Sequence, residues 1–179
     1  MSYSAPVADY LFIFNKIVNF KQLSKEDKFS EVSTDLVAAI LEEAGKISTE
    51  VLAPLQRVGD TNPAFLENGV VRTPPGFGEA YQSIADNGWI GMAASSEYGG
   101  MGLPQSLMHA VNEMMGGACL SLQLNPVMTQ GQIEALEHHA SEDLKKLYLP
   151  KLISGEWSGT MNLTEPHAGS DVGALKSVA

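Results

Sequence analysis

The 179-residue sequence is poor in basic residues, in cysteine and in long apolar runs. Its 11 lysines and arginines stand against 21 aspartates and glutamates, so the formal net charge is −10. Nucleic acids and anionic membrane surfaces select for basic patches, and this balance therefore argues against both as partners. The one cysteine, Cys119, cannot form an intramolecular disulfide, and its small apolar neighbours indicate a buried structural thiol.

Targeting signals and several common catalytic loops are also missing. No basic residue precedes Lys16, and the apolar run of residues 10–14 is too short for a signal peptide or a membrane span. We therefore expect a cytoplasmic protein without membrane insertion. The sequence lacks the G-x-S-x-G, G-x-x-x-x-G-K and G-x-G-x-x-G loops of hydrolase, P-loop and Rossmann sites. His138 and His139 invite a metal site with Glu134, but no second cluster supplies further ligands, so we expect no metal.

What the chain does contain is helical periodicity. Hydrophobic residues make up 44% and charged residues 18%, which is typical of a globular protein. Apolar side chains recur at helical spacing in six stretches, which predict a mainly α fold. These stretches are residues 7–18, 35–53, 76–87, 104–115, 125–139 and 141–149. Pro54 is expected to end or kink the second helix, and Asn68-Gly69 predicts a small hairpin.

The periodicity changes near residue 155. In residues 157–164 (WSGTMNLT) alternate side chains would share a face, which predicts a β-strand. A loop of small residues with Gly169 and Ser170 follows. These residues suit a strand edge beside a planar polar ring, with a hydroxyl loop for an anionic group. They equally suit a β-turn in which Ser170 or Asp171 acts only as a cap.

Three stretches resemble, in order and spacing, motifs of the acyl-CoA dehydrogenase family. LTEPHAGSD (163–171) is similar to its flavin-contact motif L-T-E-P-x-A-G-S-D. SSEYGGMGLP (95–104) is similar to its P-x-E-Y-G-G-x-G turn, and KLYLPKLISGEW (146–157) to its K-x-x-Y-L-P-x-L-x-x-G-E segment. The start of the chain, YSAPVADYLFIFNKIVNF, resembles the extra N-terminal helix of a bacterial branch that includes 3-methylmercaptopropionyl-CoA dehydrogenase-like proteins.

The resemblance implies a three-part organisation. Residues 1–34 would form an N-terminal extension helix, and residues 35–155 the helical N-terminal domain of the family. Residues 156–179 would begin the middle β domain, with its first strand and the flavin-contact loop. The general base, a glutamate in most members, comes from a C-terminal helical bundle, and we see no candidate for it in residues 1–179. We therefore expect no catalytic residue here, and a segment of a larger enzyme that is inactive alone.

The resemblance also implies a chemistry. Such enzymes remove a proton from the α-carbon and a hydride from the β-carbon of an acyl-CoA, pass the hydride to N5 of FAD and leave an enoyl-CoA. By resemblance, backbone groups of Met161 and Leu163 contact the pyrimidine edge of the flavin, and the Thr164 hydroxyl reaches toward N5 and O4. Gly169 and Ser170 lie against the FAD pyrophosphate or the CoA substrate.

For the full-length protein, the resemblance implies a role in fatty-acid or related acyl-CoA oxidation. It also implies an electron-transfer flavoprotein as acceptor and a homo-oligomeric assembly. Two alternatives stay open. The chain could come from an acyl-CoA oxidase relative, or it could be a truncated, non-catalytic homologue that acts as an interaction module.

Overall fold

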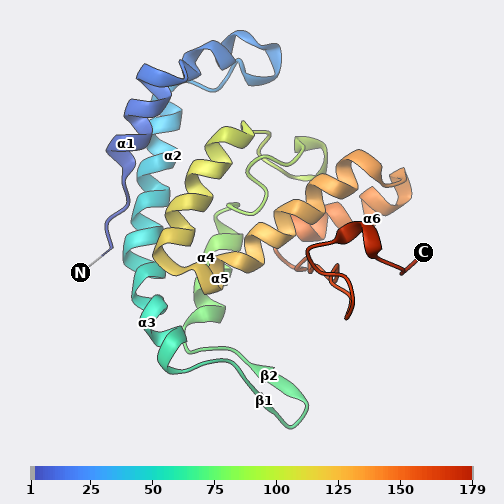
Figure 1. The fold of residues 1–179 in the computed structure, drawn as a ribbon. Helices are drawn as coiled ribbons and strands as arrows, with labels where there is room; N and C mark the ends of the chain where they lie inside the picture. Colours follow the sequence, from blue (N-terminus) through green and yellow to red (C-terminus); the bar gives the residue numbers. More distant parts are fainter. Residues whose placement is uncertain (1–2, 179) are drawn as a thin grey trace.

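The computed structural model describes residues 3–178, and most of them lie in helices, as the sequence predicted (Figure 1). The α-helices are α1 (Val7–Phe12), α2 (Thr34–Lys46), α3 (Ala53–Thr61), α4 (Phe77–Asp86), α5 (Gln105–His139) and α6 (Glu142–Ile153). Short π or 3-10 turns are η1 (Ile13–Ile17), η2 (Phe20–Lys25), η3 (Asp27–Phe29), η4 (Ile47–Leu52), η5 (Ser96–Tyr98) and η6 (Val172–Ala174). None of the helices within this range is both long and apolar enough to cross a bilayer.

The N-terminal segment packs onto the rest of the molecule. Phe14 stacks on Phe20 with ring centroids 4.7 Å apart, and Tyr10 lies 6.5 Å from Phe14. The Tyr3 hydroxyl donates a hydrogen bond of 2.6 Å to the carbonyl of Met114 in α5. Helix α1 also lies beside α2 (Figure 1). The division of the chain at residues 34 and 155 stays a prediction.

The helical path does not end at Pro54. The Ser33 side chain caps α2 by accepting from the amide of Leu36 at 3.1 Å. The π turn η4 then leads directly into α3, in whose first turn Pro54 lies. The backbone stays helical through Leu52 and Ala53, so Pro54 lies within a continuous helical path, in which it can donate no backbone hydrogen bond. The predicted end near residue 53 was therefore wrong, and the helical path runs on to Thr61.

The hairpin predicted from Asn68-Gly69 is present, and it projects from the helical body (Figure 1). Strands β1 (Phe65–Glu67) and β2 (Val70–Arg72) pair antiparallel. Asn68 and Gly69 have φ values of 50° and 79°, which a two-residue hairpin turn of this kind requires. The hairpin predicted from the sequence is therefore confirmed, and the pattern that predicted it consists of two adjacent residues.

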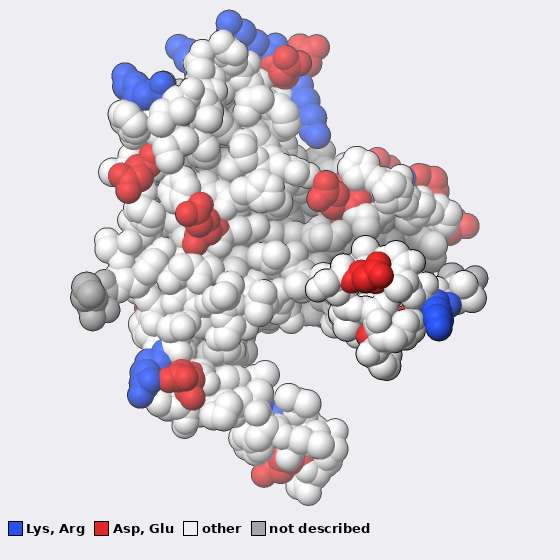
Figure 2. Space-filling view, in the orientation of Figure 1, with Lys and Arg blue, Asp and Glu red and all other residues white. Residues whose placement is uncertain are grey.

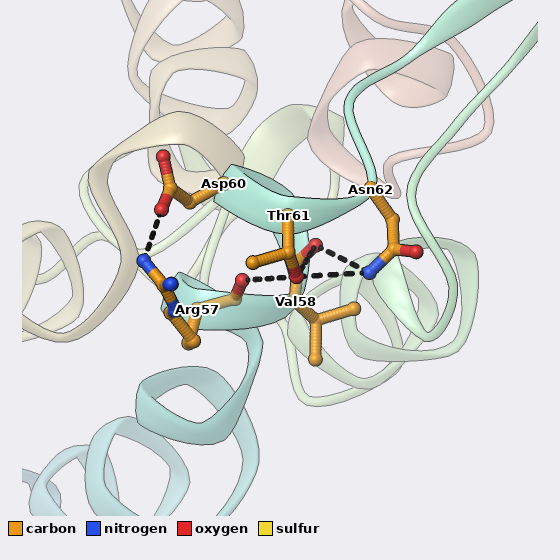
Figure 3. A network of polar contacts seen from close by, with 5 residues as sticks. All are labelled: Arg57, Val58, Asp60, Thr61 and Asn62. Carbon is orange, nitrogen blue, oxygen red and sulfur yellow. Dashed lines mark hydrogen bonds and ion pairs between the residues drawn. The ribbon is translucent and has the colours of Figure 1, made fainter.

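Polar side chains close the end of α3 just before the hairpin (Figure 3). The Thr61 hydroxyl donates to the carbonyl of Arg57 at 2.9 Å, and the Asn62 amide donates to the carbonyl of Val58 at 3.2 Å. Arg57 also pairs with Asp60 across the same turn. Because the last carbonyls of a helix have no partner within it, these groups define where α3 stops and the hairpin begins.

Helix α5 consists of two limbs that meet at Cys119. That residue has non-helical backbone angles (φ −154°, ψ 86°) and no exposed surface, in agreement with a buried structural thiol. The two limbs are tied by Asn112, which donates to Gln130 at 2.7 Å and accepts from Gln123 at 3.0 Å. The sequence predicted helices over 104–115 and 125–139; the second limb in fact begins directly after the kink.

The strand predicted for residues 157–164 was wrong as an element of this structure. No regular secondary structure is assigned there, and the nearest β pairing among residues 3–178 is the single bridge between Glu165 and Ala168. A strand requires a hydrogen-bonded neighbour, and alternation of side chains does not provide one. The segment is held instead by side chains of α4 and α5.

Candidate functional site

The segment that carries the flavin-like motif is fastened to the second limb of α5. The amide of Gly159 donates to the hydroxyl of Thr129 at 3.0 Å, and Gln132 donates to the carbonyl of Thr160 at 2.7 Å. Thr129 is fully buried. A Cβ at Gly159 would lie 2.3 Å from Cγ of Gln132 and 3.2 Å from Cα of Thr129, so only glycine allows this close approach.

A second attachment comes from α4. The Tyr81 hydroxyl donates to the carbonyl of Gly155 at 3.0 Å and lies 3.2 Å from Oγ of Ser158. Gly155 itself has φ +77°, and a Cβ there would lie 2.6 Å from Cβ of Ala85. The turn after α6 and the segment that follows it are therefore positioned from two helices.

Between this segment and α5 lies an open groove of about 720 Å³. One side is formed by residues 159–164, and the other by Ser121, Leu124, Asn125 and Met128 of α5. Three residues predicted to bind the cofactor, Met161, Leu163 and Thr164, line this groove and are exposed.

The backbone groups of residues 161–164, along the groove, have no hydrogen-bond partners within residues 3–178. Within residues 3–178, no hydrogen bond uses the amide or carbonyl groups of Met161, Asn162, Leu163 or Thr164. Backbone groups of this kind are strong donors and acceptors and normally find partners. The groove therefore offers several adjacent polar positions, opposite a side of α5 that carries Leu124 and Met128.

The loop that follows is closed by Glu165. Its backbone exchanges hydrogen bonds with Ala168 at 3.0 and 3.1 Å, and its carboxylate accepts from the amides of Lys176 at 3.0 Å and Ser177 at 2.8 Å. Hydrogen bonding from the Ser177 side chain, followed by the backbone amides of Ser177 and Lys176, lowers the pKa of the Glu165 carboxyl. His167 lies on the same closure, with Nε2 at 3.1 Å from the carbonyl of Ala174. We call residues 165–177, held by this carboxylate, the Glu165 clasp.

The two remaining predicted site residues, Gly169 and Ser170, lie in the clasp and are exposed. A Cβ at Gly169 would lie 3.7 Å from Cγ2 of Thr164, which places this glycine beside the threonine. Ser170 does not line the groove. The structure thus gathers Met161, Leu163 and Thr164 on one groove, brings Gly169 next to Thr164, and leaves Ser170 exposed in the clasp without a place on the groove.

Sequence reasoning missed the residues that position the site. Thr129, Gln132 and Tyr81 hold the segment from 28 or more residues away along the chain, and no local pattern marks them. A threonine and a glutamine on an amphipathic helix were indistinguishable from ordinary helical residues.

His138 and His139 lie in the last turn of α5 and do not line the groove. Glu134 accepts a hydrogen bond from Gln105 at 3.2 Å. In the part of the chain that the structure describes, no three metal-ligating side chains come together.

Comparison with known proteins identifies the family. Residues 34–156 match the family described as acyl-CoA dehydrogenase, N-terminal domain. The chain is 43% identical over all its 179 residues to 3-methylmercaptopropionyl-CoA dehydrogenase of Ruegeria pomeroyi, of which it covers 30%. It is 32% identical to a butyryl-CoA dehydrogenase of Syntrophomonas wolfei, with 97% of this chain and 29% of that protein covered.

A solved structure agrees. The glutaryl-CoA dehydrogenase complex with glutaryl-CoA matches with a TM-score of 0.67 and 28% identity, over 78% of this chain and 33% of that one. The chain thus spans about a third or less of the length of these relatives. The resemblance predicted from the three motifs, and from the N-terminal stretch, is confirmed: the chain belongs to the acyl-CoA dehydrogenase family.

Proposed function

We propose that this chain forms part of the flavin and substrate site of an FAD-dependent acyl-CoA dehydrogenase, which converts an acyl-CoA thioester to an enoyl-CoA. The observation that carries the proposal is the groove along residues 159–164, which Thr164 lines together with residues whose backbone groups are free of hydrogen bonds within residues 3–178. Membership of the family supports it. Because the chain covers 30% of its relative from Ruegeria pomeroyi, the activity is proposed for the larger protein.

The groove residues fit a flavin on chemical grounds. The pyrimidine edge of an isoalloxazine is a planar row of donors and acceptors, and the backbone groups of Met161 and Leu163 are free to pair with such a row. When bound, FAD would accept the hydride from the β-carbon of the acyl group. The Thr164 hydroxyl would donate a hydrogen bond toward N5 and O4 of the flavin, where hydride transfer develops negative charge. A fixed donor aimed at developing charge stabilises the transition state.

The Glu165 clasp would support the same site. It presents the Gly169 backbone and the Ser170 hydroxyl on a closed loop, which suits the pyrophosphate of FAD or the CoA moiety of the substrate. Backbone N–H groups carry a partial positive charge and donate hydrogen bonds, so they can bind phosphate even in a protein with a net negative charge.

The acyl group would lie along α5, against Leu124 and Met128. No carboxylate lines the groove in residues 3–178, so we propose that the group that removes the α-proton comes from another part of the enzyme. We also propose an electron-transfer flavoprotein as acceptor, a cytoplasmic location, a homo-oligomeric full-length protein and a role in fatty-acid or related acyl-CoA oxidation.

Thr164→Val in the full-length enzyme tests the proposal. Removal of one donor to developing charge typically lowers a rate by a factor of about 10² to 10³. We expect a loss of this order in the rate of flavin reduction by acyl-CoA, measured by stopped-flow absorbance, while product binding changes far less. Thr49→Val is the matched control, since Thr49 lies in η4 and lines neither wall of the groove. An unchanged reduction rate would remove Thr164 from the mechanism.

A further inference from the structure

Helix α5 is kinked at Cys119, and the limb that follows the kink carries one wall of the groove. An unbroken α-helix holds its own direction through regular hydrogen bonds between residues four apart. The non-helical angles at Cys119 interrupt this geometry, so the direction of the second limb depends on what packs around the junction. The same limb carries Thr129 and Gln132, which hold the groove segment.

The start of the chain contacts α5 just before this junction. The Tyr3 hydroxyl donates to the carbonyl of Met114 at 2.6 Å. The Tyr3 ring lies against Gly117, where a Cβ would be 3.3 Å from Cε2 of the ring. A side chain at position 117 would press on the ring, and glycine leaves room for it. We call these two interactions the Tyr3 contact.

The Tyr3 contact lies on a different face of the first limb from the polar ties described above. Asn112 forms those ties with Gln123 and Gln130. Gly117 lies five residues beyond Asn112, which corresponds to about 140° around the helix axis. The end of the first limb is therefore held from two directions, by amide side chains on one face and by Tyr3 on another.

The segment that carries Tyr3 is itself attached to the body of the molecule. A Cβ at Gly45 of α2 would lie 2.8 Å from Cγ2 of Val7 and 3.4 Å from Cβ of Ala5. Tyr10 is buried, and burial, followed by the nearby Glu113 carboxylate, raises the pKa of its hydroxyl. The N-terminal segment is therefore packed on α2 and lies beside the turn of α5 that contains Glu113.

Uncharged side chains form these attachments, and the basic side chains of the segment lie elsewhere. Tyr3, Ala5 and Val7 carry no charge. Figure 2 shows basic side chains at the top of the molecule, and the exposed lysines of η1 to η3 are Lys16, Lys21, Lys25 and Lys28. The Tyr3 contact therefore depends on packing and one hydrogen bond, and not on ion pairs.

We propose that Tyr3 is a positioning residue for the groove: its contact with α5 fixes the direction of the second limb, and with it the wall on which flavin and substrate lie. This inference rests on the proposed function. Residues 3–33 precede the part of the chain that matches the family domain, residues 34–156, so the contact comes from a segment outside that match. Because reaction rates depend steeply on geometry, a small shift of this wall slows flavin reduction.

Two substitutions of Tyr3 test the inference, and two others in the same segment are controls. Tyr3→Phe removes only the hydroxyl, and Tyr3→Ala removes the ring as well. Ser4→Ala removes an exposed hydroxyl from the adjacent residue. Phe12→Ala removes an aromatic ring that is 59% exposed. Each control therefore repeats one of the chemical changes at an exposed position.

The experiment uses the full-length enzyme and two measurements. Amide hydrogen exchange, followed by mass spectrometry, reports on residues 120–128 of the second limb. Stopped-flow absorbance gives the rate of flavin reduction at saturating acyl-CoA, with whichever of butyryl-CoA and dodecanoyl-CoA reduces the wild-type flavin faster. We expect Tyr3→Phe to speed this exchange by about two- to tenfold and to slow reduction by about threefold or more. Tyr3→Ala should have larger effects, and Ser4→Ala and Phe12→Ala should have neither.

The outcomes separate positioning from a role in stability alone, and from the proposed function. If Tyr3→Phe and Tyr3→Ala lower Tm but match the controls in exchange and in reduction rate, Tyr3 only stabilises the fold and the inference is refuted. Faster exchange with an unchanged reduction rate would also refute it, because the groove would then not depend on the second limb. If neither acyl-CoA reduces the wild-type flavin, the proposed function is refuted, and the positioning role with it.

Discussion

Thr129→Val tests how the groove segment is held. The substitution keeps the shape of the side chain but removes the hydroxyl that accepts from the amide of Gly159 at 3.0 Å and donates to the carbonyl of Asn125 at 3.0 Å. Thr129 is fully buried, so water does not replace the lost oxygen. A donor that loses its partner in such a place costs about 1–3 kcal/mol.

The expected magnitude lies in the lower part of that range. Gly159 is only partly buried, so its amide regains some hydration, and we expect a loss of about 1–2 kcal/mol in the free energy of unfolding. For a domain of this size each kcal/mol lowers Tm by about 2–4 °C. Thr129→Val should therefore lower Tm by about 2–8 °C, with no change in volume to add a cavity term.

Two measurements on the same samples check this. Thermal unfolding followed by far-UV circular dichroism gives the change in Tm, and amide hydrogen exchange reports the protection of Gly159. Thr49→Val is the control, because no hydrogen bond to the Thr49 side chain occurs in residues 3–178, and it should shift stability by less than about 0.5 kcal/mol. Equal Tm values for the two variants, or unchanged exchange at Gly159, would refute this account of the attachment.

Three further results are expected. Gly159→Ala places a methyl 2.3 Å from Cγ of Gln132. Overpacking of this kind should lower the free energy of unfolding by about 1–3 kcal/mol, measured by chemical denaturation. An unchanged free energy of unfolding would show that the segment shifts freely. The lowered pKa of Glu165 means that its clasp is present at neutral pH and is lost as pH falls through the folded-state pKa. The amide resonance of Ser177 should report that titration, and Glu165→Gln should abolish it; an unaffected titration would point to another group. Gly69→Val forces a β-branched residue to φ +79°, costs about 1–2 kcal/mol and should melt the hairpin in NMR spectra, whereas intact cross-strand contacts would contradict the turn assignment.

The features that sequence predicted well are those with local causes. Asn68-Gly69 defined the hairpin because the turn needs two residues with positive φ and little else. Helical spacing located α1, α2, α4, α6 and most of α5 because the apolar face recurs within a few residues, but it missed α3, which lies beyond the predicted end near residue 53. The three motifs identified the family and placed Met161, Leu163 and Thr164 together on one segment.

The features that escaped prediction depend on distant parts of the chain. The backbone angles at Cys119 join two helices without a loop, and Pro54 follows a π turn that no local pattern indicated. The contacts of Thr129 and Gln132 with the groove segment cross 30 and 28 residues. Alternation in residues 157–164 predicted a strand. A strand also needs a second strand to which it hydrogen-bonds, and the sequence of the segment alone does not show whether one is present.

The attachment at Gly159 and Thr160 limits how far along the groove Thr164 can lie. Thr160 is held by Gln132, and four residue steps separate it from Thr164, which limits their separation to about 14 Å at full extension. One inserted residue would lengthen this tether by about 3.5 Å, more than the length of a hydrogen bond, and would turn different side chains toward the groove. The number of residues between Thr160 and Thr164 is therefore constrained as strictly as their identity.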